Sequence, residues 1–215
     1  MPLDIARLDP ARTVLLVIDM QNDFLQPGAP LESAAGRAMI PTLNIAIESC
    51  RTAGIPVLFT THVHRRTGAD MGAFARLYPP VATRSALIDG TPGVDIHPDV
   101  ARLDTDELIK KHRYSAFFDT DLDTLLRGMD TSTVVVAGVT TEDCVQSTAR
   151  DAMFRNFDTV VLSDACATYD HPDLGYGAMT ADQVHTASLV VLAQSTAHVT
   201  TVQQFTSRLP VAHPA

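Results

Sequence analysis

Residues 133–139 read Thr-Val-Val-Val-Ala-Gly-Val, and a segment with a helical pattern follows them at 142–156. Short apolar runs that are rich in β-branched side chains are typical of strands. A strand that is apolar at every position has both of its faces covered, as is usual in a parallel sheet. These residues therefore predict a parallel β-sheet with helices on both faces.

The same alternation of apolar runs and helical segments extends along the chain. We expect further strands at residues 14–18, 55–61, 107–110, 159–162 and 197–202. We expect helices at residues 34–53, 70–77, 121–128, 142–156 and 181–195. Strands that alternate with helices in this way build three-layer α/β/α folds of the Rossmann-like kind. The length of 215 residues fits a single domain over residues 1–215.

The composition limits the partners and the location of the protein. Lys and Arg number 16 against 25 Asp and Glu, so the net charge is −9, which argues against binding to nucleic acid or to an anionic membrane. No apolar run is long enough to cross a membrane, and the first residues lack the apolar core of a signal peptide, so we expect a cytoplasmic protein. The three cysteines are widely spaced, which indicates neither a disulfide framework nor a zinc site.

Cys144 lies where the strand predicted at 133–139 gives way to the following helix. The amino end of a helix is electropositive and favours a thiolate, so we expect this position to lower the pKa of the thiol. The thiolate is a nucleophile, which makes Cys144 a candidate catalytic residue. The alternative is a small buried apolar side chain, which is what most cysteines are. Asp143 beside it would oppose the thiolate unless its side chain pointed away.

Two charged residues follow two other predicted strands. Asp19 comes directly after the first strand, and Lys111 directly after the third. Because ligands of parallel sheets bind beyond the carboxyl ends of the strands, these side chains could meet Cys144 in one cleft. A carboxylate could take the proton of the thiol, and a lysine could stabilise the anions. Alternatively, Asp19 is a loop acid, and Lys110 and Lys111, which point to opposite sides of the strand, are charges at its edge.

Three segments that carry these candidates resemble one known family. They read Leu-Leu-Val-Ile-Asp-Met-Gln-Asn-Asp-Phe at 15–24, Lys-His-Arg-Tyr-Ser-Ala-Phe-Phe-Asp-Thr-Asp-Leu at 111–122 and Gly-Val-Thr-Thr-Glu-Asp-Cys-Val-Gln-Ser-Thr at 138–148. Together and in this order they are similar to the isochorismatase-like cysteine hydrolases, over residues 13 to 202. The resemblance implies a six-stranded parallel sheet and a catalytic triad of Asp19, Lys111 and Cys144.

The resemblance also implies a cis peptide bond between Val139 and Thr140. This bond would direct the Thr140 amide alongside the Cys144 amide, toward the oxygen of a substrate carbonyl. Two such donors form an oxyanion hole.

The family includes nicotinamidases, hydrolases of ureido and N-carbamoyl compounds, and isochorismate hydrolases. Isochorismate hydrolases cleave a vinyl ether and commonly lack the cysteine, so Cys144 disfavours that activity. Nicotinamidases hold a metal through an Asp-x-His…His motif, whereas His62 and His64 stand here without the aspartate. We therefore expect no metal and no other cofactor. A dinucleotide-binding module is disfavoured because no Gly-x-Gly-x-x-Gly follows a predicted strand.

The resemblance thus implies an amidohydrolase of a small amide, ureido or N-carbamoyl compound, which releases ammonia or an amine through a thioester. The alternatives are a vinyl-ether hydrolase and a catalytically silent family member that acts as a scaffold subunit. Members of the family are often dimers or tetramers, so we expect a homo-oligomer.

Three further residues are candidates for substrate binding. Phe24 stands where the family has an aromatic pocket wall, Gln194 could pair with a ureido group, and Arg65 could bind a substrate carboxylate. Each also has a plain structural interpretation: core packing for Phe24, an exposed helix end for Gln194, and a solvated surface charge for Arg65.

Overall fold

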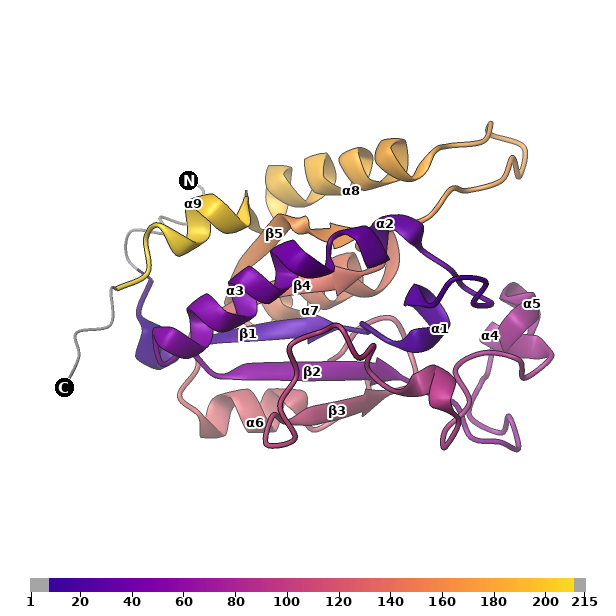
Figure 1. Ribbon diagram of the computed structural model, residues 1–215, viewed down its shortest axis with the longest axis horizontal. Coiled ribbons are helices and arrows are strands. Elements are labelled where there is room, and N and C mark those ends of the chain that lie inside the picture. The colour runs from indigo at the N-terminus through magenta and orange to yellow at the C-terminus, as the bar shows by residue number, and fades with distance from the viewer. Residues whose placement is uncertain (1–7, 211–215) are drawn as a thin grey trace.

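In the computed structural model, which describes residues 8–210, the strands form one parallel sheet (Figure 1). The strand order is β3-β2-β1-β4-β5-β6, and every neighbouring pair is parallel. The strands are β1 (Thr13–Ile18), β2 (Val57–His62), β3 (Leu108–Lys111), β4 (Thr133–Val139), β5 (Asp158–Ala167) and β6 (His198–Thr200). The predicted six-stranded parallel sheet is confirmed.

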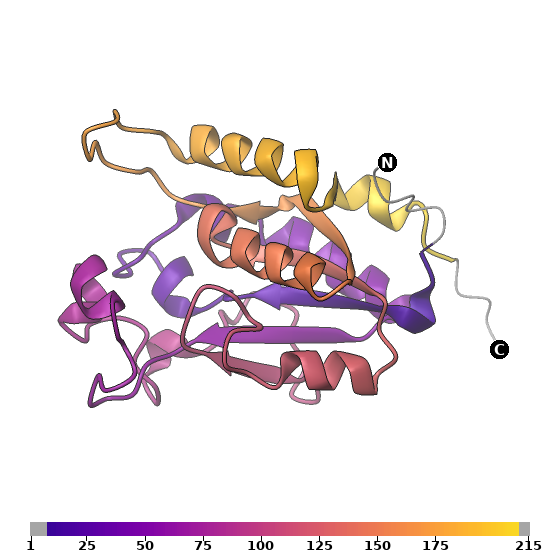
Figure 2. The same ribbon diagram turned by 180° about the vertical axis from the view of Figure 1, so that it is seen from behind.

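Helices cover both faces of this sheet, which confirms the three-layer architecture. One face carries α2 (Ala34–Ala38), α3 (Ile40–Thr52) and α9 (Val202–Thr206), which lie in front of the sheet in Figure 1. The other face carries α6 (Leu122–Gly128), α7 (Gln146–Phe154) and α8 (Ala181–Ser195), which lie in front in Figure 2. No helix in the described part of the chain is long and apolar enough to span a bilayer.

The side chains of β1 show why the central strands read as continuous apolar runs. Leu15 and Val17 belong to the core that α3 covers, whereas Val14, Leu16 and Ile18 belong to the core that α6 and α7 cover. All five are at most 1% exposed. Because each face of the sheet is buried under a helical layer, neither set of alternating positions can be polar.

The helix predicted at residues 34–53 is in fact two helices that meet at Met39. A continuous helix would need a hydrogen bond from the amide of residue 41 to the carbonyl of Arg37. Pro41 has no amide hydrogen, and it stands instead in the first turn of α3, where no such donor is needed. The prediction of a single helix was wrong because this effect of the proline was overlooked.

The strand predicted at 159–162 is longer than expected. β5 continues to Ala167, and its register against β4 shifts between Val136 and Gly138. Residues 163–167, for which the sequence predicted no strand, therefore extend β5 beside the carboxyl end of β4. Helix α9 at the end of the described chain was not predicted.

Short helical segments gather at the carboxyl end of the sheet. These are α1 (Asn22–Leu25), α4 (Phe74–Leu77), α5 (Pro79–Ala82) and the 3₁₀ turn η3 (Pro92–Val94), whereas the 3₁₀ turn η2 (Pro10–Arg12) precedes β1 at the opposite end (Figure 1). The strand order reverses between β1 and β4, and open α/β sheets bind their ligands in the crevice at such a point. The topology therefore directs attention to the residues that follow β1, β3 and β4.

Candidate active site

Asp19 is the first residue after β1 and turns the chain out of the sheet. Its φ is 50°, a left-handed conformation that aspartate tolerates better than most residues. Thr60 of β2 holds it twice: the hydroxyl donates to Asp19 Oδ1 over 2.6 Å and accepts from the Asp19 amide over 3.2 Å. Asp19 is fully buried, and these two hydrogen bonds to the neighbouring strand fix the direction of its carboxylate.

Lys111 ends β3, a strand in which exposed and buried side chains alternate. Lys110 points outward, as the alternation predicts, and Lys111 is completely buried. The ammonium group of Lys111 meets three acceptors: a carboxylate oxygen of Asp19 at 2.6 Å, the Arg113 carbonyl oxygen at 3.0 Å and Cys144 Sγ at 3.4 Å. An ammonium carries three hydrogens, so all of its donors are used and its position is fixed.

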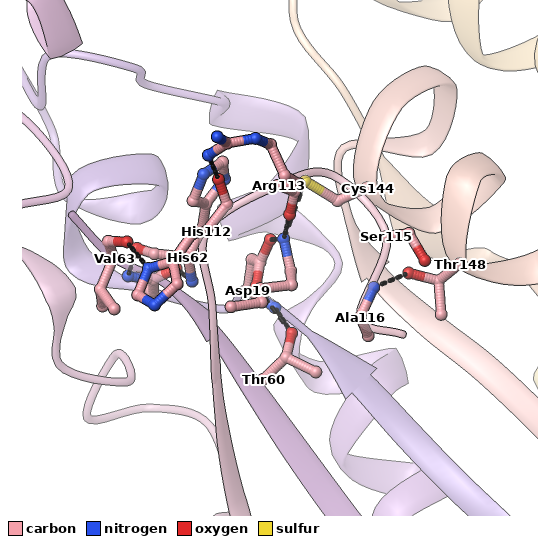
Figure 3. Close-up of polar contacts among 12 residues, drawn as sticks. Asp19, Thr60, His62, Val63, His112, Arg113, Ser115, Ala116, Cys144 and Thr148 are labelled. Atoms are coloured by element: carbon pink, nitrogen blue, oxygen red, sulfur yellow. Dashed lines mark hydrogen bonds and ion pairs between the residues drawn. The ribbon is translucent and has the colours of Figure 1, made fainter. Parts of the chain in front are cut away.

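Cys144 lies in a π-helical turn, η4 (Thr141–Val145), which connects β4 to α7. Such turns are rare and occur frequently at functional sites. The turn brings the sulfur toward the end of β1, and Figure 3 shows Cys144 and Asp19 approaching the same point from different elements. A carboxylate oxygen of Asp19, a ring nitrogen of His62 and the sulfur of Cys144 lie within 4.8 Å of one another. The fold therefore brings together the side chains at positions 19, 111 and 144.

Burial decides the protonation state of the Cys144 thiol. Removal from water raises its pKa well above the usual value; Lys111 opposes this rise, whereas the carboxylates of Asp19 and Asp143 add to it. The expectation that a helix end lowers this pKa is therefore wrong, because desolvation of a fully buried thiol outweighs the favourable charges. Burial alone would lower the pKa of Lys111, but Asp19 and Cys144 more than offset it and the pKa is raised. The resting site thus holds a neutral thiol beside an ion pair.

Two backbone features shape the turn that precedes Cys144. The peptide bond between Val139 and Thr140 is cis, as the family resemblance implied. Gly138 has a φ of 122°, and a Cβ at this position would overlap the carbonyl oxygen of Ile18. Only glycine lets the end of β4 approach the end of β1 so closely.

A pocket opens at Cys144, with an empty volume of about 350 Å³ that includes its opening to solvent. Phe24 and Thr140 line this pocket, as the sequence predicted. Most of the remaining wall is apolar or aromatic, including Phe74, Tyr78, Tyr114 and Tyr169. A concave, largely apolar wall with a few polar groups suits a small molecule. The role of the Thr140 and Cys144 amides as an oxyanion hole stays a prediction.

Two residues that were predicted to bind substrate lie elsewhere. Gln194 is exposed and lines a different hollow, together with Asp158 and His198 at the starts of β5 and β6. Helix α8 connects two parallel strands, so it runs back along the sheet and its last turn reaches the end opposite to Cys144. Arg65 is exposed and does not line the pocket. Both predictions are corrected by this geometry.

Several polar groups of the site were not predicted. Thr60 orients Asp19, and the buried amide of Gln21 bonds the backbone N–H and carbonyl of His62, which ties the end of β1 to the end of β2. Buried polar side chains next to apolar strands need such partners, so their presence in the sequence was a usable signal. The hydroxyl of Tyr78 donates to Asp143 Oδ2 over 2.9 Å, a contact between distant segments that no local pattern reveals.

The comparison with known proteins agrees with this geometry. A model of the isochorismatase domain matches residues 13–204. The chain belongs to the isochorismatase family. The matched region includes every strand of the sheet and the residues Asp19, Lys111 and Cys144.

Relatives within the isochorismatase family carry different names. A probable inactive nicotinamidase of Arabidopsis thaliana is 30% identical over 199 residues, which cover 92% of this chain and 96% of that protein. A ureidoacrylate amidohydrolase of Pantoea ananatis is 33% identical over 173 residues, which cover 73% of this chain and 69% of that protein. A solved structure of a cysteine hydrolase from Pseudomonas syringae pv. phaseolicola 1448A has a TM-score of 0.91 at 33% identity and covers 96% of both chains. The family and its amidase-named relatives support a hydrolase.

Two groups of side chains in the described residues could hold a metal ion. The first consists of Asp19, His62 and Cys144. The ammonium of Lys111 already contacts two of these three residues, and its positive charge opposes a divalent cation at the same place. This group therefore fits a metal ion poorly.

The second group contains His64, one of the two histidines discussed above in connection with a metal. Beside His64 lie Asp70 and His112, potential metal-binding side chains that the sequence did not reveal: Asp70 Oδ2 lies 3.4 Å from His64 Nδ1 and 3.2 Å from His112 Nδ1. The guanidinium of Arg113 donates to the Asp70 carbonyl over 3.0 Å, so a positive charge lies beside this group as well. The absence of a metal requirement stays a prediction.

Proposed function

We propose that this protein is a cysteine amidohydrolase that cleaves the C–N bond of a small amide, ureido or N-carbamoyl compound. One observation supports this most directly: beside Cys144, which lines the pocket, the Lys111 ammonium lies 2.6 Å from Asp19 and 3.4 Å from Cys144 Sγ. A nucleophile, a proton acceptor and a fixed positive charge that meet in one small pocket are what acyl transfer to a thiol requires.

The first half of the reaction forms a thioester. Cys144 Sγ attacks the carbonyl carbon while the Asp19 carboxylate takes the thiol proton, so the buried site does not need a standing thiolate. The fixed charge of Lys111 stabilises the sulfur during this transfer, and the amides of Thr140 and Cys144 would hold the oxyanion. The tetrahedral intermediate collapses when Asp19 gives its proton to the departing nitrogen. Ammonia or an amine leaves, and the acyl group stays on sulfur.

The second half repeats these proton transfers with water. Asp19 takes a proton from a water molecule, whose oxygen attacks the thioester carbonyl. When this intermediate collapses, the C–S bond breaks and the sulfur recovers the proton from Asp19. The sum is hydrolysis of one C–N bond by one water molecule, and the enzyme returns to a neutral thiol beside the pair of Asp19 and Lys111.

Two other functions compete with this proposal. A catalytically silent scaffold is a serious alternative, because a relative that this chain matches over 96% of its length is named a probable inactive nicotinamidase. Against it stand the complete set of Asp19, Lys111 and Cys144 and the pocket above them. A vinyl-ether hydrolase is disfavoured because its chemistry has no need for the thiol of Cys144.

The test is a screen for ammonia release by the purified protein. The panel contains primary amides, ureides such as biuret, and N-carbamoyl amino acids, with isochorismate as a vinyl-ether control whose turnover is followed by pyruvate release. We expect turnover of at least one C–N substrate, no turnover of isochorismate, and no loss of activity after dialysis against a chelator. A folded protein that hydrolyses none of the panel would support the scaffold. Activity that is lost to the chelator and restored by a divalent cation would contradict the metal-free mechanism.

A further inference from the structure

The charge of the pocket wall indicates which charge a substrate should carry, which the triad alone does not. Among the described residues that line the pocket, none is a lysine or an arginine, and Asp143 is the one carboxylate. Lys111 lies behind the reacting groups and its ammonium is already used by three acceptors. A substrate that carries a carboxylate would therefore meet Asp143, while the nearby cations Lys111 and Arg113 already donate to other acceptors.

Asp143 stands directly beside the nucleophile and faces the same space. It is partly buried, and the hydroxyl of Tyr78 donates to it over 2.9 Å, with a further hydrogen bond from Tyr114. In the described chain no Lys or Arg lies within ion-pair distance of this carboxylate, which His171 and Lys111 stabilise only from further away, whereas Asp19 has its own lysine. A partly buried carboxylate without a cation is costly unless something pairs with it. The open side of the pocket is where such a partner can enter.

Aromatic rings surround this carboxylate. Tyr78, Tyr114 and Tyr169 line the pocket with Phe74, whose ring packs edge-on against Tyr114 with centroids 4.9 Å apart. The faces of aromatic rings attract cations, and groups of such rings recognise alkylammonium ligands. Burial raises the pKa of Tyr169 to about 12, so this phenol stays neutral in ordinary buffers.

We propose, building on the amidohydrolase function above, that the pocket selects short amides that carry an alkylammonium group, and that Asp143 pairs with this group. Asp143 and the nucleophile are consecutive residues, so their Cα atoms are about 3.8 Å apart. The positive charge of the substrate must then lie within a few bonds of the carbonyl that Cys144 attacks. Asp143 is a substrate-binding residue that sets specificity in this account.

The same pairing explains why a carboxylate is placed where it opposes the nucleophile. Asp143 contributes to the raised pKa of Cys144. Burial also raises the pKa of Asp143 itself, and a cation beside it holds the carboxylate ionised. When the substrate brings the compensating charge, the repulsion between Asp143 and the developing thiolate is offset. A cationic substrate therefore both binds better and reacts faster than a neutral one of the same shape.

The experiment uses two amides of the same shape. Trimethylammonioacetamide and 3,3-dimethylbutanamide are primary amides that differ only in a positively charged nitrogen in place of a quaternary carbon. Malonamate is a third primary amide, and it carries a negative charge. The readout is the ratio of kcat/KM for the cation to kcat/KM for the neutral amide, in the wild-type protein and in Asp143→Asn. The asparagine oxygen can still accept from Tyr78, so the variant removes the charge and keeps the hydrogen bond. Comparing the two proteins cancels the difference in intrinsic reactivity between the amides.

We expect Asp143→Asn to lower this ratio at least about tenfold, which corresponds to about 1.4 kcal/mol, because the cation loses its partner while the neutral amide no longer meets the opposing charge. Glu142→Gln is the matched control, because Glu142 is the neighbouring acid but accepts from Thr168 over 2.8 Å and does not line the pocket. We expect it to change the ratio much less.

Three outcomes overturn the inference: an equal loss for both amides in Asp143→Asn, a preference for malonamate, or no preference for the cation in the wild-type protein. The last two decide the matter even if the variant does not fold. If no amide is cleaved, the proposed function fails first. Calorimetric binding of the same pair to Cys144→Ala then tests the inference separately, and equal affinities would overturn it.

Discussion

Lys111 shows how one residue holds a buried site together. Its charge is completely shielded from water, and its three hydrogens reach Asp19, a backbone carbonyl and the sulfur of Cys144. These three catalytic candidates could be predicted from the sequence because each lies at or just beyond the end of a strand and within a family motif. The protonation of Cys144 could not, since it depends on how completely the fold excludes water. Substrate contacts at Arg65 and Gln194 were predicted wrongly because their position relative to the pocket is set by tertiary structure.

At this scale we predict that Lys111→Met costs about 3–5 kcal/mol of unfolding free energy, because it leaves the Asp19 carboxylate buried without its cation. Lys110→Met is the matched control: Lys110 is exposed and pairs with Asp89 over 2.7 Å, and such surface pairs contribute about 0–1 kcal/mol. Urea unfolding of both variants measures the difference. The double variant Asp19→Asn/Lys111→Met should recover much of the loss. Equal, small costs for the two lysines would contradict this account of the ion pair.

At the scale of elements, the site depends on how closely β1 and β4 approach. The strands themselves could be predicted, because apolar runs between turn residues are a strong local signal. The π-helical turn η4, the shifted register of β5 and the contact between Tyr78 and Asp143 could not, because they arise from long-range packing. The sequence shows Gly138, but only the tertiary structure shows why a glycine is needed there: the carbonyl of Ile18 lies where a Cβ would be.

We predict that Gly138→Ala destabilises the protein by at least about 2 kcal/mol, because the new methyl group meets Ile18 backbone at a φ that alanine disfavours. The change should also lower activity by moving the turn that carries Cys144. Gly128→Ala, in α6, is the control: a Cβ there has nothing within 4 Å. Its effect should stay within about 1 kcal/mol, toward higher stability. Thermal unfolding and kcat/KM check both, and a harmless Gly138→Ala would refute the close approach.

At the scale of the whole molecule, the three-layer α/β/α architecture followed from the alternation of strands and helices. The oligomeric state and the cellular location did not follow from it. The homo-oligomer and the cytoplasmic location stay predictions; a monomeric mass in light scattering would contradict the first. Stability as a function of pH is also a property of the whole chain, because every group whose pKa changes on folding contributes to it.

His62 makes a specific contribution to that dependence. Burial, followed by the charge of Lys111, lowers its pKa well below the usual value. The unfolded chain therefore takes up a proton at His62 below about pH 6.5, and the folded protein does not. The free energy of unfolding should fall with decreasing pH in this range, by up to about 1.4 kcal/mol per pH unit from this residue.

Urea unfolding of the wild-type protein and of His62→Gln between neutral and mildly acidic pH isolates this contribution. The comparison is needed because burial raises the pKa of Asp143 and Asp23, which acts in the opposite direction as the pH falls. We expect a shallower fall in stability for the variant. Identical slopes for the two proteins would show that His62 does not stay neutral on folding.

The most direct test of the proposed chemistry removes the sulfur. Cys144→Ala deletes one buried atom and leaves the ion pair of Asp19 and Lys111 in place. With any amide that the wild-type protein cleaves, we predict that kcat/KM falls at least about a thousandfold, while circular dichroism shows an unchanged fold. Ammonia release by Cys144→Ala within about tenfold of the wild-type rate would contradict a nucleophilic thiol, and with it the thioester mechanism.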